Sequence, residues 1–331
     1  MSEYYRPIPQ AEGGRWRLAG GWTGFSRLEC LSRGAAPRIV DDAPDAVIEA
    51  LVAPRPPLLG LTLDRPRLMG IVNATPDSFS DGGRYDAAHH ATALVAAGAD
   101  MLDIGGESTR PGAAEVAVAD EIARILPAIR AGAAMAPVSV DTRKAAVAAP
   151  ALEAGAGMVN DVSGLDFDPA LAGLVAAWGA PLCLMHAQGL PQTMQDDPRY
   201  DDVLLDVYDA LALRIARAEA AGIPRHRIVI DPGIGFGKTQ AHNLAILRRI
   251  SLYHGLGCAI LLGVSRKRFV GAIGGAEAPQ DRAPGTLALT IMAVAQGVQI
   301  HRVHDVAEHA QGLRLWGAVT GTDNENERAE Q

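Results

Sequence analysis

Short apolar runs alternate with longer amphipathic or alanine-rich segments from Leu68 onward. This alternation is typical of repeated βα units that build a parallel sheet. The predicted strands span residues 68–72, 101–104, 138–140, 158–159, 182–185, 228–230, 260–264 and 298–303.

Eight strands close a TIM (β/α)8 barrel of about 250 residues, and residues 61–319 offer that length. The predicted fold class is therefore α/β, a TIM barrel with a short N-terminal extension. Residues 1–60 form the extension, since they hold glycine pairs, scattered aromatics and the stiff run Pro54-Arg55-Pro56-Pro57. Its role is not readable from the sequence. Residues 320–331 are polar and charged and are predicted to be disordered.

Polar residues stand at the ends of all the predicted strands. In a TIM barrel these ends converge on one mouth, where the chemistry takes place. A single Asp after a strand is more often a helix cap or a turn former. Eight polar ends at one rim indicate a site instead. They are Asn73, Asp103, Asp141, Asn160, His186, Asp231, Ser265 with Lys267, and Arg302 with His304.

Composition excludes several classes of protein. The formal net charge of −8 gives no basic footprint for nucleic acid. No apolar run is long enough to span a bilayer, and the N-terminus lacks a secretory pattern. Cys30, Cys183 and Cys258 lie far apart, which argues against a disulfide framework or a structural zinc site. We therefore expect a cytoplasmic protein with neither nucleic-acid nor membrane partners.

The glycine-rich run from Gly233 to Thr239 looks like a nucleotide-binding P-loop. The Walker spacing needs a glycine at position 232, which is Pro232 here, so that interpretation fails. The histidines form no zinc pattern, and we expect surface or capping roles for His242, His254 and His309.

Two loop motifs are the most specific features of the chain, NATPDSFSDGG at 73–83 and GGESTRPGA at 105–113. Shorter motifs follow in order: SVDT at 139–142, NDVSG at 160–164, LMH at 184–186, DPGIGFGK at 231–238, SRK at 265–267 and RVHD at 302–305. Together they resemble the dihydropteroate synthases, over about residues 60–319. The resemblance implies attack by the amine of 4-aminobenzoate on the methylene of 6-hydroxymethyl-7,8-dihydropterin pyrophosphate. It also implies a homodimer.

The resemblance assigns the pterin site to residues suited to a flat heterocycle. Asp231 can accept from the adjacent amino and ring N–H groups of a pterin in a bidentate arrangement. Asn160 suits the neighbouring ring edge, and Asp141 the remaining N–H. Lys267 can donate to the pterin carbonyl and ring nitrogen. The ring faces are assigned to Met185 and Phe236, for which core packing is the plainer alternative.

The leaving diphosphate needs cationic donors. Arg302 and His304 alternate along the last predicted strand, so they point to the same side and can bind it. Asn73 offers an oxygen ligand for Mg²⁺, which takes its other ligands from water and substrate phosphates.

The resemblance also implies that bond breaking precedes attack. Asp81 would then stabilise a cationic pterin methylene, and it joins Lys267, Arg302 and His304 as a catalytic candidate. The 4-aminobenzoate candidates are Phe79, Thr109, Arg110, Pro111, Lys267 and Arg268. Arg268 departs from the pattern, because many members of the family carry serine there.

Two alternatives share the barrel and its pterin-recognising carboxylates. A pterin-dependent methyltransferase has no use for a diphosphate site, and Asn73, Arg302 and His304 disfavour it. A non-catalytic paralogue that binds pterin without turnover is expected to show decayed loops. Both long motifs are intact in this sequence.

Overall fold

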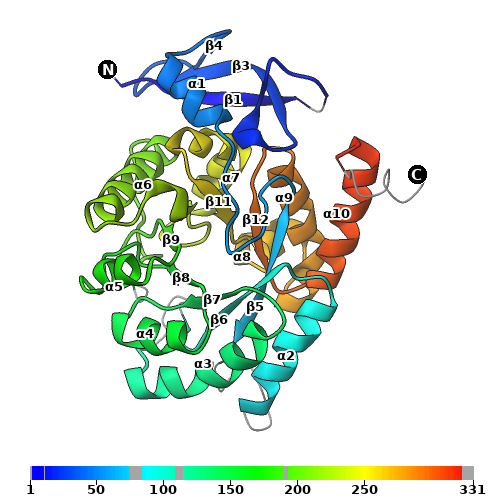
Figure 1. Ribbon diagram of the computed structural model, residues 1–331. Helices are drawn as coiled ribbons and strands as arrows, with labels where there is room; N and C mark the ends of the chain where they lie inside the picture. Colours follow the sequence, from blue (N-terminus) through cyan, green and yellow to red (C-terminus); the bar gives the residue numbers. More distant parts are fainter. Residues whose placement is uncertain (1, 11, 75–83, 109–114, 190–192, 323–331) are drawn as a thin grey trace.

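The computed structural model describes residues 2–10, 12–74, 84–108, 115–189 and 193–322 (Figure 1). The chain forms a closed parallel barrel preceded by a four-stranded antiparallel sheet. The barrel strands are β5 (Arg67–Asn73), β6 (Met101–Gly105), β7 (Val138–Asp141), β8 (Met158–Asp161), β9 (Leu182–Met185), β10 (Ile228–Asp231), β11 (Ala259–Leu262) and β12 (Ile300–Val303). The predicted TIM barrel is confirmed.

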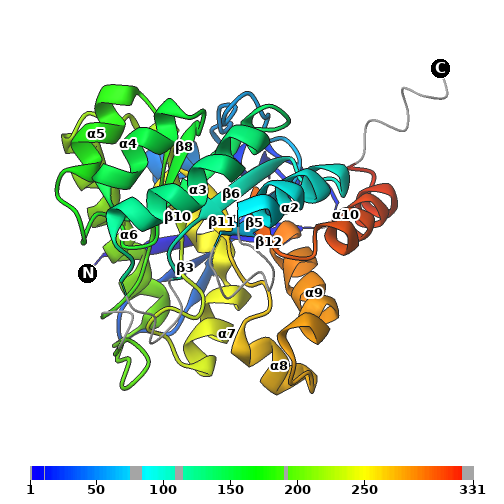
Figure 2. The same cartoon turned by 90° about the horizontal axis from the view of Figure 1, so that it is seen from below.

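Helices surround the barrel, as the view from below shows (Figure 2). They are α2 (Arg84–Ala96), α3 (Val118–Ala133), α4 (Ala145–Glu153), α5 (Leu171–Trp178), α6 (Val203–Ala220), α7 (Gln240–Arg248), α8 (Arg268–Gly274), α9 (Ala283–Val294) and α10 (Val306–Thr320). The short 3-10 helices are η3 (Arg225–Arg227), η4 (Ile250–Leu256) and η5 (Pro279–Arg282). Local signals place several of these ends. Asp202 caps α6 by accepting from two backbone N–H groups, and Gly179 ends α5 in the left-handed conformation.

Two predicted strands extend beyond the observed ones, one at its carboxyl end and the other at its amino end. The segment 260–264 stops at Leu262, because the chain turns there and the Val264 carbonyl accepts from the Lys267 amide. The segment 298–303 begins only at Ile300. Gln299 lies just before the strand, where its side chain accepts from the Ile260 amide at 2.9 Å. The residues predicted as strand but observed outside it are largely buried loop residues, and the apolar pattern alone does not distinguish such residues from a strand.

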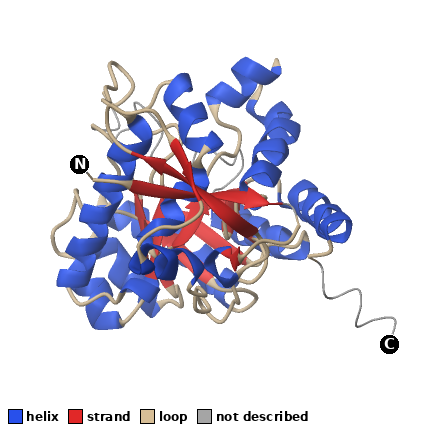
Figure 3. Cartoon of the chain, turned by 90° about the horizontal axis from the view of Figure 1, so that it is seen from above, coloured by secondary structure: helices blue, strands red, loops and turns tan. Residues whose placement is uncertain are grey.

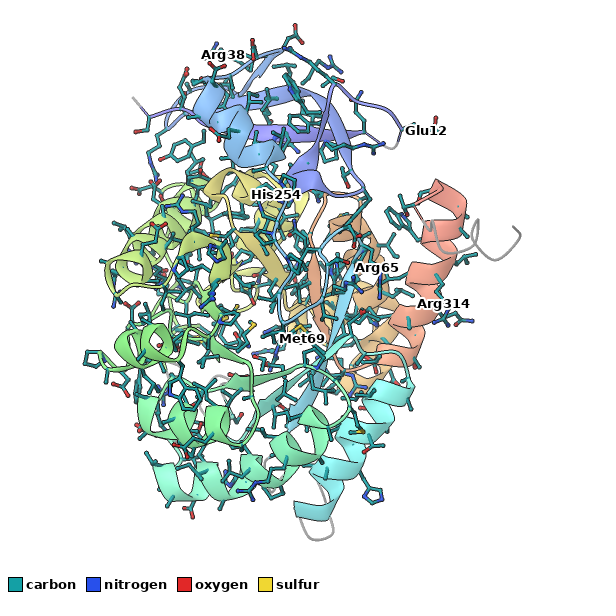
Figure 4. All side chains as sticks on the ribbon, viewed as in Figure 1. Glu12, Arg38, Arg65, Met69, His254 and Arg314 are labelled. Carbon is teal, nitrogen blue, oxygen red and sulfur yellow. The ribbon has the colours of Figure 1, made fainter. Side chains whose placement is uncertain are left out.

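Strand residues alternate between the barrel interior and the helix layer. Outward residues such as Leu102, Val140 and Leu184 join the large core beneath the helices. Inward residues form a second apolar cluster that includes Met69, near the centre of the barrel in Figure 4. Its buried strand residues are Met69, Met101, Met158, Cys183, Val229, Ala259, Leu261 and Ile300, and Leu58 and Leu63 join them from the segment before β5. This cluster fills the barrel on the side of the strands' amino ends, which we call the floor.

The N-terminal residues fold into a sheet of their own. Its elements are β1 (Tyr4–Gln10), β2 (Trp16–Arg17), η1 (Leu18–Gly20), β3 (Gly24–Leu31), β4 (Arg38–Val40) and α1 (Asp45–Val52). β3 is central, pairing with β1 on one edge and with β2 and β4 on the other. The view from above shows the sheet lying across the end of the barrel (Figure 3).

The sheet joins the barrel through η4, which directly precedes β11 and so lies at the floor. Arg55 is one link, since its buried guanidinium donates to the carbonyls of Ala50, Ala53, His254 and Cys258. Figure 4 shows His254 at this junction.

The structure corrects the expectation for two histidines. His254 and His309 are completely buried, so the surface role expected for them is wrong. His254 lies in η4, beneath the N-terminal sheet, which the strand pattern of the barrel does not predict. His309 lies in α10 with its ring against the Asp305 carbonyl. His242 does cap α7, as expected. Within the described residues, no helix is both long and apolar enough to cross a bilayer.

Candidate active site at the carboxyl mouth of the barrel

Along β6, β8 and β12 the side chains that face the barrel interior change from apolar to polar between one inward position and the next. Met101, Met158 and Ile300 belong to the floor cluster. Two residues later the same strands carry Asp103, Asn160 and Arg302. Because side chains two apart share a face, these polar groups stand directly above the apolar layer. We call this end the mouth.

Arg302 is the centre of the polar layer. Its Nε donates to Asp103 at 2.5 Å, and an Nη donates to Asp141 at 2.8 Å. The Asn160 amide donates to the same Asp103 oxygen at 3.0 Å. Side chains from β6, β7, β8 and β12 therefore meet in one network, and the sequence prediction that Asp141, Asn160 and Arg302 gather at a common rim agrees with their positions.

The network is incomplete within the described residues. Asp103 Oδ1, Asp141 Oδ1 and Ser139 Oγ are buried and have no hydrogen-bond partner there. Buried polar atoms are almost always paired, because desolvation without a partner costs roughly 1–3 kcal/mol. Two of these atoms are carboxylate oxygens and can only accept when ionised. The arrangement suits a ligand that brings N–H donors into the mouth.

Two carboxyl groups of the mouth, those of Asp141 and Asp231, have pKa values raised above the ordinary value. Burial raises the pKa of Asp141 to about 7, with Arg302 opposing the shift. Burial also raises the pKa of Asp231, while the Gly233 N–H at 2.7 Å and the charge of Lys267 oppose it. Burial therefore disfavours the ionised forms of both groups in the free protein, and a ligand that donates N–H bonds would favour them.

Met185 and Phe236 form the apolar part of the mouth. Met185 ends β9 next to Asp231, its register partner in β10. Phe236 is half-buried in the loop after β10, and the Lys267 ammonium lies 4.1 Å from the centre of its ring. Lys267 thus reaches over the mouth from the loop after β11. These residues border the same space as the carboxylates.

The end of β12 is fixed to the loop after β11. Ser265 Oγ lies 2.8 Å from the His304 ring and accepts from the His304 amide at 3.1 Å. Arg266, whose φ is +56°, pairs with Asp305. Arg268 is exposed at the start of α8. β12 ends at Val303, so strand alternation does not extend to His304, and the contact with Ser265 is what places its ring beside the loop after β11.

Comparison with known proteins decides the family. The sequence model of the family described as pterin binding enzymes matches residues 69–304. Dihydropteroate synthase of Escherichia coli K12 is 44% identical over 276 residues, which cover 82% of this chain and 97% of that protein. The chain belongs to the dihydropteroate synthase family. Among its relatives of known structure is Xanthomonas albilineans dihydropteroate synthase with 4-aminobenzoic acid, at 47% identity and a TM-score of 0.74 over 78% of this chain and 94% of that one. The same enzyme in complex with 7,8-dihydropteroate matches at 44% identity and a TM-score of 0.72, over 78% and 95% of the two chains.

Five predicted site residues of this synthase-family chain lie outside the described residues. They are Asp81 and Phe79 in the first long motif, and Thr109, Arg110 and Pro111 in the second. The roles expected for them stay predictions.

Asn73 is half-buried at the end of β5, in register with Gly105 of β6. Among the described residues, no group of three His, Cys, Asp or Glu side chains could hold a metal ion. A Mg²⁺ ion that arrives with a diphosphate needs few protein ligands, because it keeps waters and binds phosphate oxygens. The single amide oxygen of Asn73 fits that demand.

Two residues of the mouth were not assigned from the sequence. The sequence places Asp103 at a strand end without indicating a role, whereas in the structure it is completely buried and binds both Arg302 and Asn160. Its inward position two residues after Met101 was the available signal. Lys238 belongs to the motif at 231–238 and to a run that looks like a P-loop, but no sequence signal shows that its side chain is buried.

Proposed function

We propose that this chain condenses 6-hydroxymethyl-7,8-dihydropterin pyrophosphate with 4-aminobenzoate to give 7,8-dihydropteroate and pyrophosphate, a step of folate biosynthesis. The observation that carries the proposal is the set of buried acceptors at the mouth. Asp103 and Asp141 each present a carboxylate oxygen without a partner among the described residues, and the buried Asp231 stands on the neighbouring side. A pterin edge carries the N–H groups that such acceptors require.

Each group has a place in this reaction. Asp231 accepts from the amino and ring N–H pair, while Asn160 and Asp141 bind the next edge of the ring. Met185 and Phe236 pack on its faces, as apolar walls do around a few fixed polar groups. Lys267, above Phe236, donates to the pterin carbonyl and ring nitrogen.

The diphosphate binds at the end of β12. Arg302 supplies positive charge there and His304 a hydrogen-bonding ring, while Asn73 would hold Mg²⁺, which would neutralise charge on the leaving group. The bond between the methylene carbon and the diphosphate oxygen breaks first. The amine nitrogen of 4-aminobenzoate then forms its bond to that carbon and loses a proton. Asp81 stabilises the cationic methylene between these steps.

The 4-aminobenzoate ring lies between Phe79 and Pro111, near Thr109 and Arg110. Its carboxylate is bound by Lys267, the exposed Arg268 or the backbone N–H of that residue. Sulfonamides carry the same aniline ring, so we expect them to compete with 4-aminobenzoate. Inhibition that does not depend on the 4-aminobenzoate concentration would contradict this slot.

Pyrophosphate release tests the proposed function directly. We expect release when Mg²⁺, the pterin diphosphate and 4-aminobenzoate are all present, and a marked loss when 4-aminobenzoate is omitted or Mg²⁺ is chelated. Pterin binding without release would support a non-catalytic paralogue. Methyl transfer from a methylated pterin would support a methyltransferase instead.

We further propose a cytoplasmic homodimer. The three cysteines are free and buried, as suits a reducing compartment. Apolar side chains are exposed on α8 and α10, where Ile273, Leu315 and Val319 are 57%, 67% and 80% exposed. Such residues are typical of a surface that a second copy covers. Light scattering of Leu315→Arg against the unmodified chain tests the dimer, and an unchanged mass would argue against this surface.

A further inference from the structure

Lysine is rare in this chain and is confined to the mouth. Lys and Arg together number 30, yet only three of them are lysines: Lys144, Lys238 and Lys267. All three follow barrel strands, namely β7, β10 and β11. Lys144 pairs with Glu107 and Glu121, and Lys267 lies over Phe236. Lys238 has no role in the proposed reaction.

Lys238 is buried, with 3% of its surface exposed. Its Nζ donates to the carbonyls of Gly233 at 2.9 Å, Phe236 at 3.1 Å and His186 at 3.2 Å, and it lies 2.8 Å from His186 Nδ1. No carboxylate is among these four partners. A P-loop lysine extends toward a phosphate, whereas this one turns inward and binds both its own loop and the loop after β9.

The four partners belong to the two loops that carry the pterin groups. His186 follows Met185, and its backbone N–H donates to the Asp231 carbonyl at 2.9 Å. Gly233 donates to the Asp231 side chain at 2.7 Å, and Phe236 closes the turn by donating to the Gly233 carbonyl at 3.1 Å. The ammonium therefore stands at the point where the position of the carboxylate and that of the ring wall are both set.

The two loops are packed too closely to accept a different spacing. A Cβ on Gly233, whose φ is +66°, would lie 1.9 Å from the His186 carbonyl oxygen. A compact ammonium on a flexible stem can reach acceptors grouped around one point, while a planar guanidinium is larger and directs its donors in a fork. The site thus favours lysine in a chain that uses arginine for most of its positive charge.

We propose that Lys238 is a positioning residue for pterin recognition, holding Asp231 and Phe236 at the spacing of a pterin ring by joining the loops after β9 and β10. This inference rests on the proposed function. It assigns Lys238 no contact with substrate. Its loss moves the ring wall and the carboxylate apart while leaving the rest of the mouth in place.

Arg55 offers a matched control. It is also a buried cation, bound to four backbone carbonyls, but it lies at the floor. We expect Lys238→Met and Lys238→Arg to raise the Kd for the pterin diphosphate at least roughly tenfold, measured by calorimetry on folded protein. The KM for 4-aminobenzoate at saturating pterin should change less than twofold. Arg55→Met should lower the melting temperature and leave the pterin Kd within twofold.

Chemical rescue separates positioning from a general loss of structure. Lys238→Ala removes the ammonium and the stem, so methylammonium can enter and donate to the same carbonyls. We expect it to lower the pterin Kd of Lys238→Ala at least threefold, whereas tetramethylammonium, which cannot donate, should have no effect. If Lys238→Met, Lys238→Arg or Lys238→Ala does not fold, Lys238→Gln replaces it. Its amide keeps two of the donors, which favours folding, and its loss of the ammonium should still raise the Kd for the pterin diphosphate.

The outcomes distinguish the two proposals. Unmodified protein that neither binds pterin nor releases pyrophosphate overturns the proposed function itself. If the unmodified protein turns over normally and the Lys238 variants have the same pterin Kd as Arg55→Met, only the positioning role of Lys238 is overturned. Normal pterin binding by folded Lys238→Ala would overturn that role as well.

Discussion

The mouth and the floor of the barrel both bury charged side chains, but they treat them differently. At the floor, Arg55 is bound to four carbonyls, and Arg67 donates to Thr62 and Asp100. At the mouth, Arg302 binds Asp103 and Asp141, yet each carboxylate keeps an oxygen without a partner among the described residues. The two arginines of the floor find their partners within the protein, whereas the mouth is arranged for a ligand.

The difference teaches where stability and function lie in this chain. Polar groups that satisfy one another hold the fold together, whereas buried groups held ready for a ligand reduce the stability of the free protein. Substitutions at the floor should therefore alter stability alone. Substitutions at the mouth should alter binding, in some cases with a gain in stability.

The largest effect is expected for Arg302→Met. Removing the guanidinium leaves Asp103 and Asp141 buried beside each other without compensation, which should lower the free energy of unfolding by about 3–5 kcal/mol. Diphosphate binding and turnover should be lost with it. Denaturant unfolding and pyrophosphate release measure the two effects. A stable variant with normal activity would show that the network is not the centre of the mouth.

The second largest effect is expected for Arg55→Met, which should lower the free energy of unfolding by about 2–4 kcal/mol. Four carbonyls lose their donor, and each bond to a charged group contributes about 1.5–3 kcal/mol, with part recovered through water and relaxation. The KM values and kcat of the folded protein should stay within twofold. A change in pterin affinity here would break the contrast between the two ends.

Asp231→Asn should weaken pterin binding by about 1–3 kcal/mol, because the ring loses a charged acceptor. The melting temperature should stay the same or rise. Burial raises the pKa of Asp231, so the ionised carboxylate opposes folding at neutral pH, and the amide oxygen can keep the bond from Gly233. A lower melting temperature together with unchanged affinity would place Asp231 among the structural residues.

The smallest effect concerns pH and a buried histidine of β12. Burial lowers the pKa of His301 to about 3, from an ordinary value near 6.5 in the unfolded chain. Below pH 6.5 the unfolded form therefore binds a proton that the folded form does not, and stability falls by about 1.4 kcal/mol per pH unit. His301→Gln should flatten the slope between pH 6.5 and 5 by that amount in urea unfolding. An identical slope in both proteins would contradict the assignment.

The barrel and much of its mouth were predictable from the sequence, because strand period and strand order bring the polar ends to one rim. Asp141, Asn160 and Arg302 met as expected on that ground. The bond between Arg302 and Asp103 was not predictable in detail, since it joins residues 199 apart and depends on how the barrel closes. The place of Lys238 was not predictable either, because glycine spacing does not reveal which way a side chain turns.

The N-terminal sheet was also not predictable from the sequence pattern. β1 contains Pro7 and Pro9, and proline is normally evidence against a strand unless it lies at an edge. Here β1 is an edge strand, and the Pro7 carbonyl accepts from Ser251 in η4 at 2.9 Å. Pairing with β3 and this long-range contact, rather than local propensity, hold the strand in place.

The most direct test of the contrast between mouth and floor pairs calorimetric titration of the pterin diphosphate with thermal melting for three proteins: the unmodified chain, Asp231→Asn and Arg55→Met. We predict that Asp231→Asn binds more weakly and melts no lower, while Arg55→Met binds normally and melts lower. The opposite assignment, with binding lost at Arg55 and stability lost at Asp231, would contradict it.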